Sequence, residues 1–161
     1  MNGCTKQRIE LITTLIIKAT DTIVPVDTTK LVEKLGGKIV YAGDSPILEV
    51  DDKSFKIMLP FYESIVQERF EIAKLLGHLV LHLGYFSNYE MISLSASQEE
   101  QQANYFASSL LIPKDEFRSV LRANSNILTK DVNIAKVAEY FNVSKSAVIN
   151  RGRALDLLYT Q

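Results

Sequence analysis

The sequence predicts an α+β fold, in which a small antiparallel sheet of about three strands packs against a mainly helical body. Three observations lead to this prediction. Apolar residues recur every three or four positions along most of the chain, strand-like runs replace this spacing between residues 38 and 59, and residues 62–83 form a helical stretch that is apolar on nearly all sides. The 161 residues, 47% of them hydrophobic, suffice for one compact body with a real core.

The first part of the chain is predicted to change from helices to strands. Isoleucines spaced three and four positions apart indicate a first amphipathic helix, and Asp27 is a good N-cap for a short second one that two glycines end. Alternating apolar and polar residues separated by turn residues then indicate strands. The predicted elements of this part are helices at 5–20 and 27–35 and strands at 38–42, 47–50 and 55–59.

The remainder of the chain is predicted to be helical. From Ile72 onward the stretch 62–83 is apolar nearly all round, and a helix of this kind lies inside a domain, so we place it at the centre of the fold. A tight turn at Asn142 and Val143 joins the last two helices. The further helices are predicted at residues 98–111, 115–122, 132–141 and 144–158.

The central helix carries a histidine pattern related to zinc chemistry. A zinc peptidase needs two histidines at positions i and i+4, which places both imidazoles on one helix face, and a glutamate directly after the first histidine as general base. A third ligand comes from elsewhere in the fold. The segment in this chain is Arg69-Phe70-Glu71-Ile72-Ala73-Lys74-Leu75-Leu76-Gly77-His78-Leu79-Val80-Leu81-His82.

This segment resembles the central helix of the ImmA/IrrE family of metallopeptidases, which follows the pattern R-F-x-I-A-H-E-L-G-H-x-x-x-H. A second family motif, E-A-N-x-F-A-x-x-L-L-x-P, is similar to the segment from Gln102 to Pro113, and the family's C-terminal helix pair is similar to residues 137–148. The resemblance covers about residues 10–158 and implies a zincin-like central helix. The residues that fit the first pattern are Arg69, Phe70, Ile72, Ala73, Leu76, Gly77, His78 and His82.

The departures from the family pattern fall on its chemistry. Lys74 stands where the first histidine ligand belongs, Leu75 stands where the catalytic glutamate belongs, and Gln102 stands where the family has its third ligand. A protonated lysine offers no lone pair to a metal, leucine cannot accept a proton, and a neutral amide is a poor substitute for a carboxylate. We therefore expect no catalytic residue, no bound metal and no cofactor. We interpret Lys74, Leu75, His78 and Gln102 as a former catalytic cleft that binds a partner.

Lys74 is expected to supply the positive charge that a metal would have supplied. Lys74 and His78 lie one helical turn apart on the same face, so their side chains can meet. A buried ammonium without a partner would be strongly destabilising. We therefore expect the Lys74 ammonium to donate a hydrogen bond to the amide oxygen of Gln102 or to His78.

One alternative retains a metal. His78 and His82 are themselves at positions i and i+4, and Glu90, Glu99 or Glu100 could supply a third ligand. The residue after His78 is a leucine, so this shifted site also lacks a base in the expected place. The two glutamates at 99 and 100 have a simpler explanation, because carboxylates favour the first turns of a helix.

The C-terminal segment has the pattern of a helix-turn-helix, with Ser144 as the cap of its second helix. The side chains that could face phosphates or bases of DNA are Lys145, Asn150, Arg151 and Arg153. A net charge of −1 gives the chain no overall basic footprint, and similar tails belong to the fold in the peptidase family. We therefore expect this pair to serve as scaffold or partner contact and not to bind DNA.

The resemblance implies a regulatory role, because family members commonly stand beside repressors of phages or mobile elements and cleave or inactivate them. We expect residues 1–125 to form an inactive peptidase-type domain, with residues 126–161 as a helical pair packed on it. The whole would bind a transcriptional repressor or related regulator without cutting it, for example as an antirepressor. Two alternatives stay open: a metallo-endopeptidase with an altered metal site, and a DNA-binding regulator. With one cysteine, Cys4, and no signal-peptide pattern, we expect a cytoplasmic protein without membrane contact.

Overall fold

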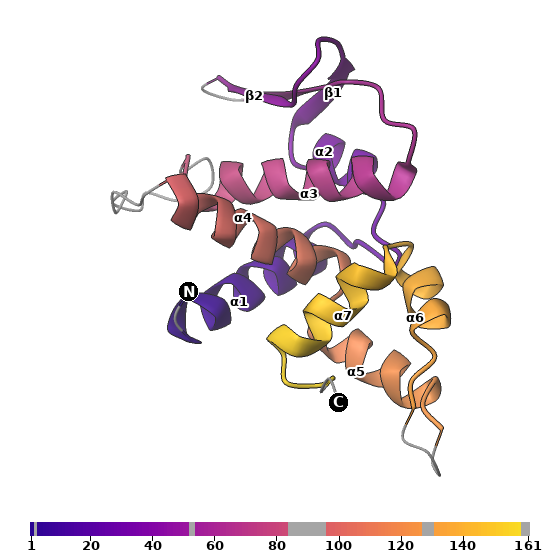
Figure 1. The fold of residues 1–161 in the computed structure, drawn as a ribbon. Helices are drawn as coiled ribbons and strands as arrows, with labels where there is room; N and C mark the ends of the chain where they lie inside the picture. The colour runs from indigo at the N-terminus through magenta and orange to yellow at the C-terminus, as the bar shows by residue number, and fades with distance from the viewer. Residues whose placement is uncertain (2, 52–53, 84–95, 127–130, 159–161) are drawn as a thin grey trace.

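The structure is a computed structural model that describes residues 1, 3–51, 54–83, 96–126 and 131–158. It confirms the α+β class: a small sheet lies on one side of a long helix, and the remaining helices lie mostly on the other (Figure 1). None of the helices in these residues is both long and apolar enough to cross a membrane. The elements are α1 (Gly3–Ala19), α2 (Thr28–Lys34), β1 (Gly37–Tyr41), β2 (Ile47–Val50), β3 (Phe55–Leu59), α3 (Ile65–Leu81), α4 (Ala96–Leu111), α5 (Lys114–Ala123), α6 (Ile134–Phe141) and α7 (Lys145–Ala154).

The sheet has the three expected strands, but it is mixed where the sequence suggested an antiparallel one. Its order is β1-β3-β2, with β3 antiparallel to β2 and parallel to β1. The physical reason lies in β3, whose Phe55, Ile57 and Leu59 are at most 2% exposed, whereas the residues of β1 and β2 are exposed or half-buried. The most apolar strand takes the central position between two strands that themselves run in opposite directions. It must therefore be parallel to one of them.

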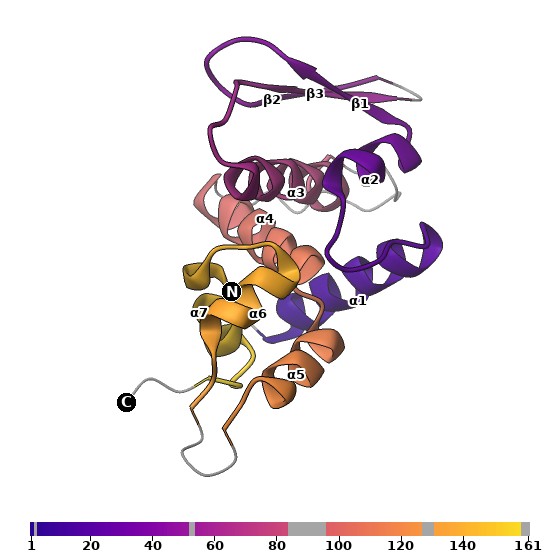
Figure 2. The ribbon, with the colours of Figure 1, turned by 90° about the vertical axis from the view of Figure 1, so that its right-hand side faces the viewer.

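The central helix α3 separates the sheet from the other long helices, as Figure 2 shows. It begins at the N-cap Ser64, whose side chain accepts a hydrogen bond from the Gln67 amide, and it is buried along most of its length. On its other side α3 packs against α4. A Cβ atom on Gly77 would lie 3.1 Å from the Cα atom of Ala103, so the small residues Gly77 and Ala103 bring the two helices close together. This approach places the last turns of α3 beside the first turns of α4.

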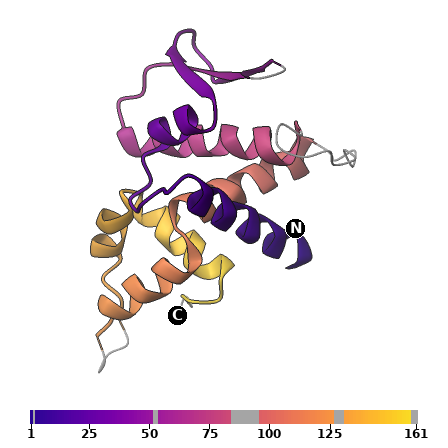
Figure 3. The same cartoon turned by 180° about the vertical axis from the view of Figure 1, so that it is seen from behind.

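Two buried arginines join distant parts of the chain to this core. Arg69 of α3 donates hydrogen bonds to the carbonyl of Val26 before α2 and to those of Phe141 and Asn142 at the end of α6. Arg151 of α7 is fully buried and bonds to α1, which lies against α4 (Figure 3). Both arginines therefore hold the C-terminal helices against the rest of the molecule.

We call the group around Arg151 the Arg151 cluster; it consists of Glu10, Tyr105, Ser109 and Arg151. The guanidinium forms two parallel bonds to the Glu10 carboxylate, of 2.6 and 2.9 Å, and a third bond of 3.0 Å to the carbonyl of Ile112. Tyr105 and Ser109 donate further hydrogen bonds to Glu10, of 2.8 and 2.9 Å. A bidentate arginine–carboxylate pair with its remaining groups satisfied is the arrangement in which a buried charge pair is tolerated.

Candidate functional site

The candidate site lies where one face of α3 meets the first turns of α4. Glu71, Lys74, His78 and His82 follow each other at steps of three and four, so their side chains line one side of the helix. Opposite them, α4 contributes Glu99, Glu100 and Gln102. The contact of Gly77 with Ala103 explains this meeting, because Glu99 and Glu100 stand about one turn before Ala103 on the side of α4 that faces α3.

Lys74 is held by two carboxylates. Its Nζ atom lies 3.0 Å from Glu71 Oε2 and 3.3 Å from Glu100 Oε1, and its side chain is 20% exposed. Burial acts to lower the pKa of Lys74, but the hydrogen bonds and charges of Glu71 and Glu100 outweigh it, so the net pKa is raised. Lys74 therefore stays an ammonium at neutral pH and presents no lone pair to a metal. We call Glu71, Lys74, His78 and Glu100 the Lys74 cluster.

These contacts correct the expected partner of Lys74. The structure pairs its ammonium with Glu71 and Glu100, whereas the amide oxygen of Gln102 lies 3.3 Å from Nε2 of His82. The reason is electrostatic, since an ionised carboxylate attracts an ammonium more strongly than a neutral amide does. Glu100 was named only as a possible third metal ligand or a helix-end charge, and its pairing with Lys74 was not expected. Its position three residues before Ala103, and so on the same side of α4, was the signal that could have revealed it.

Leu75 lies in the core and not in the Lys74 cluster. Its side chain is 8% exposed and belongs to the hydrophobic core, and Leu79, which follows His78, is fully buried. Neither Leu75, at the base position of the family pattern, nor Leu79, directly after His78, can accept a proton. The position from which a base would activate water is occupied by hydrocarbon that packs into the core.

His78 and His82 form a pair whose ring nitrogens all face polar atoms. Their Nδ1 atoms are 3.2 Å apart, Nε2 of His78 lies 3.2 Å from Glu100 Oε2, and Nε2 of His82 faces Gln102. Burial lowers the pKa of His82; the nearby positive charge that His78 can carry also lowers it, and the bond to Gln102 opposes this only in part. Potential ligand atoms of His78, His82 and Glu99 lie within 4.8 Å of one another. Glu90, the other candidate ligand, lies outside the described residues.

Comparison with known proteins agrees with this architecture. The family model of the IrrE N-terminal-like domain, a peptidase family, matches residues 56–152, which is more than half of the chain. The chain belongs to the IrrE N-terminal-like family. The match includes α3, α4 and the C-terminal helices, so it covers every described residue of the candidate site. No curated protein shows a significant match.

A solved structure of a Mycobacterium tuberculosis transcriptional regulator is similar to this IrrE-like chain. The similarity covers 90% of this chain with a TM-score of 0.63, and the sequences are 18% identical. At this identity the likeness concerns the fold alone. The chain corresponds to 46% of the length of that regulator, so it spans less than half of it.

The residues of this IrrE-like chain do not fit the zinc site that its peptidase family implies. The first ligand position holds the Lys74 ammonium, which two carboxylates keep charged, and the base position holds the buried Leu75. A divalent ion placed between residues 74 and 78 would meet a positive charge instead of an imidazole. Of the former cleft, Lys74 and His78 both contact Glu100, Gln102 contacts His82 one turn further on, and Leu75 lies in the core.

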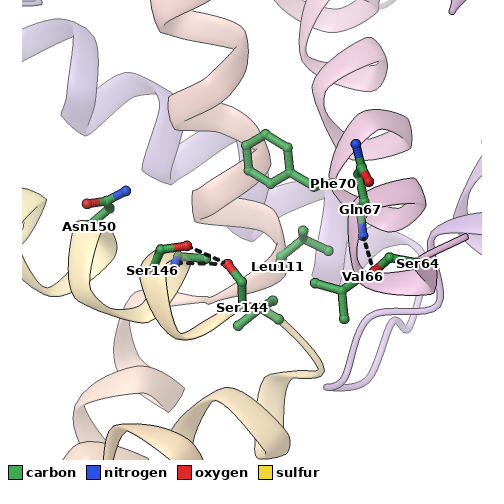
Figure 4. Close-up of a pocket in the computed structure, with 10 residues that line it drawn as sticks. Ser64, Val66, Gln67, Phe70, Leu111, Ser144, Ser146 and Asn150 are labelled. Atoms are coloured by element: carbon green, nitrogen blue, oxygen red, sulfur yellow. Dashed lines mark hydrogen bonds between the residues drawn. The ribbon is translucent and has the colours of Figure 1, made fainter. Parts of the chain in front are cut away.

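A pocket of about 390 Å³ lies between the N-terminal turns of α3 and α7. Figure 4 shows Phe70 and Leu111 among its apolar residues, with polar side chains from the first turns of both helices around them. No local sequence pattern indicates this pocket, because α3 and α7, which form its two sides, are far apart in the chain. The residues that line it are Ser64, Val66, Gln67, Phe70, Leu111, Val143, Ser144, Ser146, Ala147 and Asn150.

The C-terminal helices form the expected pair, with one correction. Asn142 adopts the left-handed conformation between α6 and α7, and Ser144 caps α7 by accepting a bond from the amide of Ala147. Of the suggested DNA contacts, Lys145, Asn150 and Arg153 are exposed. Arg151, which was named as a possible DNA contact, is instead fully buried in the Arg151 cluster, where its carboxylate partner is Glu10 of α1.

Proposed function

We propose that this IrrE-like chain is a catalytically inactive peptidase homologue that binds a regulatory protein without cleaving it. The observation that carries the proposal is the pairing of Lys74 with Glu71 and Glu100, where the family pattern places a metal ligand. A fixed ammonium at this position excludes the zinc ion that would polarise a peptide carbonyl, and Leu75 provides no base. What the site retains is a group of charged and polar side chains between α3 and α4.

The shape of the surface supports binding of a peptide segment. Gln67, Glu71, Lys74 and His78 are spaced at three or four residues, so the pocket beside Gln67 and the Lys74 cluster lie along the same face of α3. An extended segment lying along α3 would place an apolar side chain in the pocket near Phe70. Polar groups of the same segment would then meet the Lys74 cluster. This surface does not depend on a metal, so recognition survives the loss of catalysis.

The partner that we propose is a helix-turn-helix repressor or a related regulator of a phage or mobile element. Family members commonly act on such repressors, and the similar mycobacterial protein is itself named a transcriptional regulator. A chain that binds the repressor and withholds it from its operator would act as an antirepressor.

The test uses the full chain and a purified helix-turn-helix repressor of a phage or mobile element. Calorimetric titration should show saturable binding, and mass spectrometry after prolonged incubation with zinc should show an intact repressor. The variant Gln67→Trp, which fills the mouth of the pocket, should weaken binding at least tenfold, whereas Gln7→Trp on the exposed face of α1 should not. Cleavage of the repressor, or equal binding by both variants, would refute the proposal.

The two alternatives make different predictions. A metallo-endopeptidase with an altered site would cleave the repressor in the presence of zinc, and chelation would stop the cleavage. A DNA-binding regulator would use the exposed Lys145, Asn150 and Arg153, and its affinity for duplex DNA would fall steeply with salt. Asn150 and Ser144, the N-cap of α7, also line the pocket beside α3. Part of the α7 face that would enter a DNA groove therefore faces α3 instead.

A further inference from the structure

Two imidazoles near the end of α3 face each other through the same ring nitrogen. The Nδ1 atoms of His78 and His82 are 3.2 Å apart, and the ring centroids are 5.2 Å apart. Two histidine nitrogens that each lie about 2.0–2.1 Å from a tetrahedral zinc ion are about 3.3 Å from one another. The two Nδ1 atoms thus already have the separation that two ligands of one ion require.

The contacts of the outer ring nitrogens favour one placement of the imidazole protons. Nε2 of His78 faces the carboxylate of Glu100, and Nε2 of His82 faces the amide oxygen of Gln102. A neutral imidazole carries one proton, and a proton on each Nε2 satisfies both of these acceptors. Both Nδ1 atoms then present lone pairs to each other. Such a contact is favourable only when a cation lies between them.

A carboxylate completes the set of candidate metal ligands. An oxygen of Glu99 and a ring nitrogen of each histidine lie within 4.8 Å of one another, and the histidines are buried or half-buried. Glu99 belongs to the first turns of α4, whereas the histidines belong to the end of α3 and its C-cap, so the ligands come from two helices that Gly77 and Ala103 hold together. Two imidazoles and one carboxylate form a ligand set that zinc uses in proteins.

We propose that His78, His82 and Glu99 bind a divalent transition-metal ion of the zinc type, one helical turn beyond the site implied by the family pattern. Glu100 and Gln102 orient the two imidazoles from outside, as the second partners of metal-bound histidines generally do. No base follows either histidine in this chain, so the site differs from that of an active peptidase. Because its ligands come from both helices, the ion links α3 to α4. The inference is independent of whether the chain binds a repressor.

The experiment uses the untagged full chain after removal of metal with a chelator. Calorimetric titration with zinc should saturate at about one equivalent, and cobalt should give the absorption bands of a tetrahedral nitrogen and oxygen site. Zinc should also raise the melting temperature of the chain, because a ligand that binds only the folded state stabilises it. This last readout does not depend on any variant.

The variants locate the site. His82→Ala and Glu99→Gln should each weaken zinc binding more than about 100-fold, and Glu100→Gln, which removes only an outer partner, by about 10- to 100-fold. Glu99→Gln replaces a half-buried side chain and should leave the fold intact, which circular dichroism verifies. Glu33→Gln is the control, because Glu33 is an exposed carboxylate of α2 outside the site, and it should leave the affinity unchanged.

Two results would overturn the inference. The first is that the chain binds no zinc at micromolar concentrations. In that case Nδ1 of His82 would carry a proton and donate it to Nδ1 of His78. The Gln102 side-chain amide would be reversed, so that its NH₂ group donates to Nε2 of His82. The second is that zinc binding survives both His82→Ala and Glu99→Gln. Cleavage of a repressor would contradict the proposed function and leave the metal assignment untouched, so the two proposals fail separately.

Discussion

The Arg151 cluster and the Lys74 cluster each surround a cation with carboxylate, yet they serve different purposes. Arg151 is fully buried, its bond to Glu10 is bidentate, and the Glu10 side chain is only 18% exposed. Lys74 is 20% exposed, and its partner Glu100 is 48% exposed. The first cluster joins α1 to α7 inside the molecule, whereas the second joins α3 to α4 at a partly exposed position. Full burial of the cation and bidentate geometry, and not the mere presence of a charge pair, therefore distinguish the cluster that supports the fold.

The largest effect should follow from Arg151→Met. The substitution leaves Glu10 buried without its counter-charge, and breaking a buried pair in this way costs about 3–5 kcal/mol. Urea unfolding followed by circular dichroism measures the loss. The double variant Glu10→Gln/Arg151→Met removes both charges and should recover a large part of the stability. A single variant that loses less than about 1 kcal/mol would erase the distinction between the clusters.

Acid should weaken the same cluster. Burial acts to raise the pKa of Glu10, but the bond and charge of Arg151 and the bonds from Tyr105 and Ser109 together bring it below the ordinary value. A carboxylate whose folded pKa is depressed contributes stability that is fully present above its unfolded pKa of about 4.5 and is lost as pH falls through the folded pKa. Melting temperatures of the wild type from pH 7 to 3 should therefore fall more steeply than those of Glu10→Gln. Parallel curves would mean that Glu10 is not held in this way.

Tyr105→Phe should have an intermediate effect. The Tyr105 hydroxyl donates a 2.8 Å hydrogen bond to Glu10, and a hydrogen bond to a charged group contributes about 1.5–3 kcal/mol. Burial, with the nearby Glu10 carboxylate, raises the pKa of this tyrosine to about 12, so it remains a donor throughout the neutral range. Unfolding at pH 7 measures the change. Tyr140→Phe, at an exposed tyrosine that bonds to Glu116, is the matched control and should change stability by less.

Local pattern was sufficient to predict the helices, the three strands and the central position of α3, because periodicity reports which side of an element is buried. It was not sufficient for the order of strands, since pairing β3 between β1 and β2 depends on contacts that the local sequence does not specify. Arg151 is an instructive case. Val148 and Leu155 lie three and four residues from it on the same face of α7, so an apolar stripe already indicated an inward position.

In the candidate site, too, local pattern predicts some features, and others depend on contacts between distant segments. The family motif identified Lys74, Leu75 and His78 from residues adjacent in sequence, and their place on α3 needed only helical spacing. The partners from α4 depend on the packing of two helices. For this reason Gln102 was expected to accept a hydrogen bond from Lys74, and Glu100 was considered only as a third metal ligand or a helix-end charge. The pocket beside Phe70 depends on α3 and α7 together and has no counterpart in any local pattern.

The smallest effect on stability should come from Lys74→Met, and this is what makes it informative. Exposed or half-exposed ion pairs contribute about 0–1 kcal/mol, because water screens the charges and two long side chains must be ordered. Urea unfolding should therefore show a change below about 1 kcal/mol, several times smaller than for Arg151→Met. If the cost instead approached that of Arg151→Met, Lys74 would be a structural cation and its position in the former catalytic helix would reflect the needs of the fold. If the cost is small, Lys74 adds little to the stability of the fold. Its charge then contributes by excluding a metal ion from the family's ligand position and by contacting a bound partner.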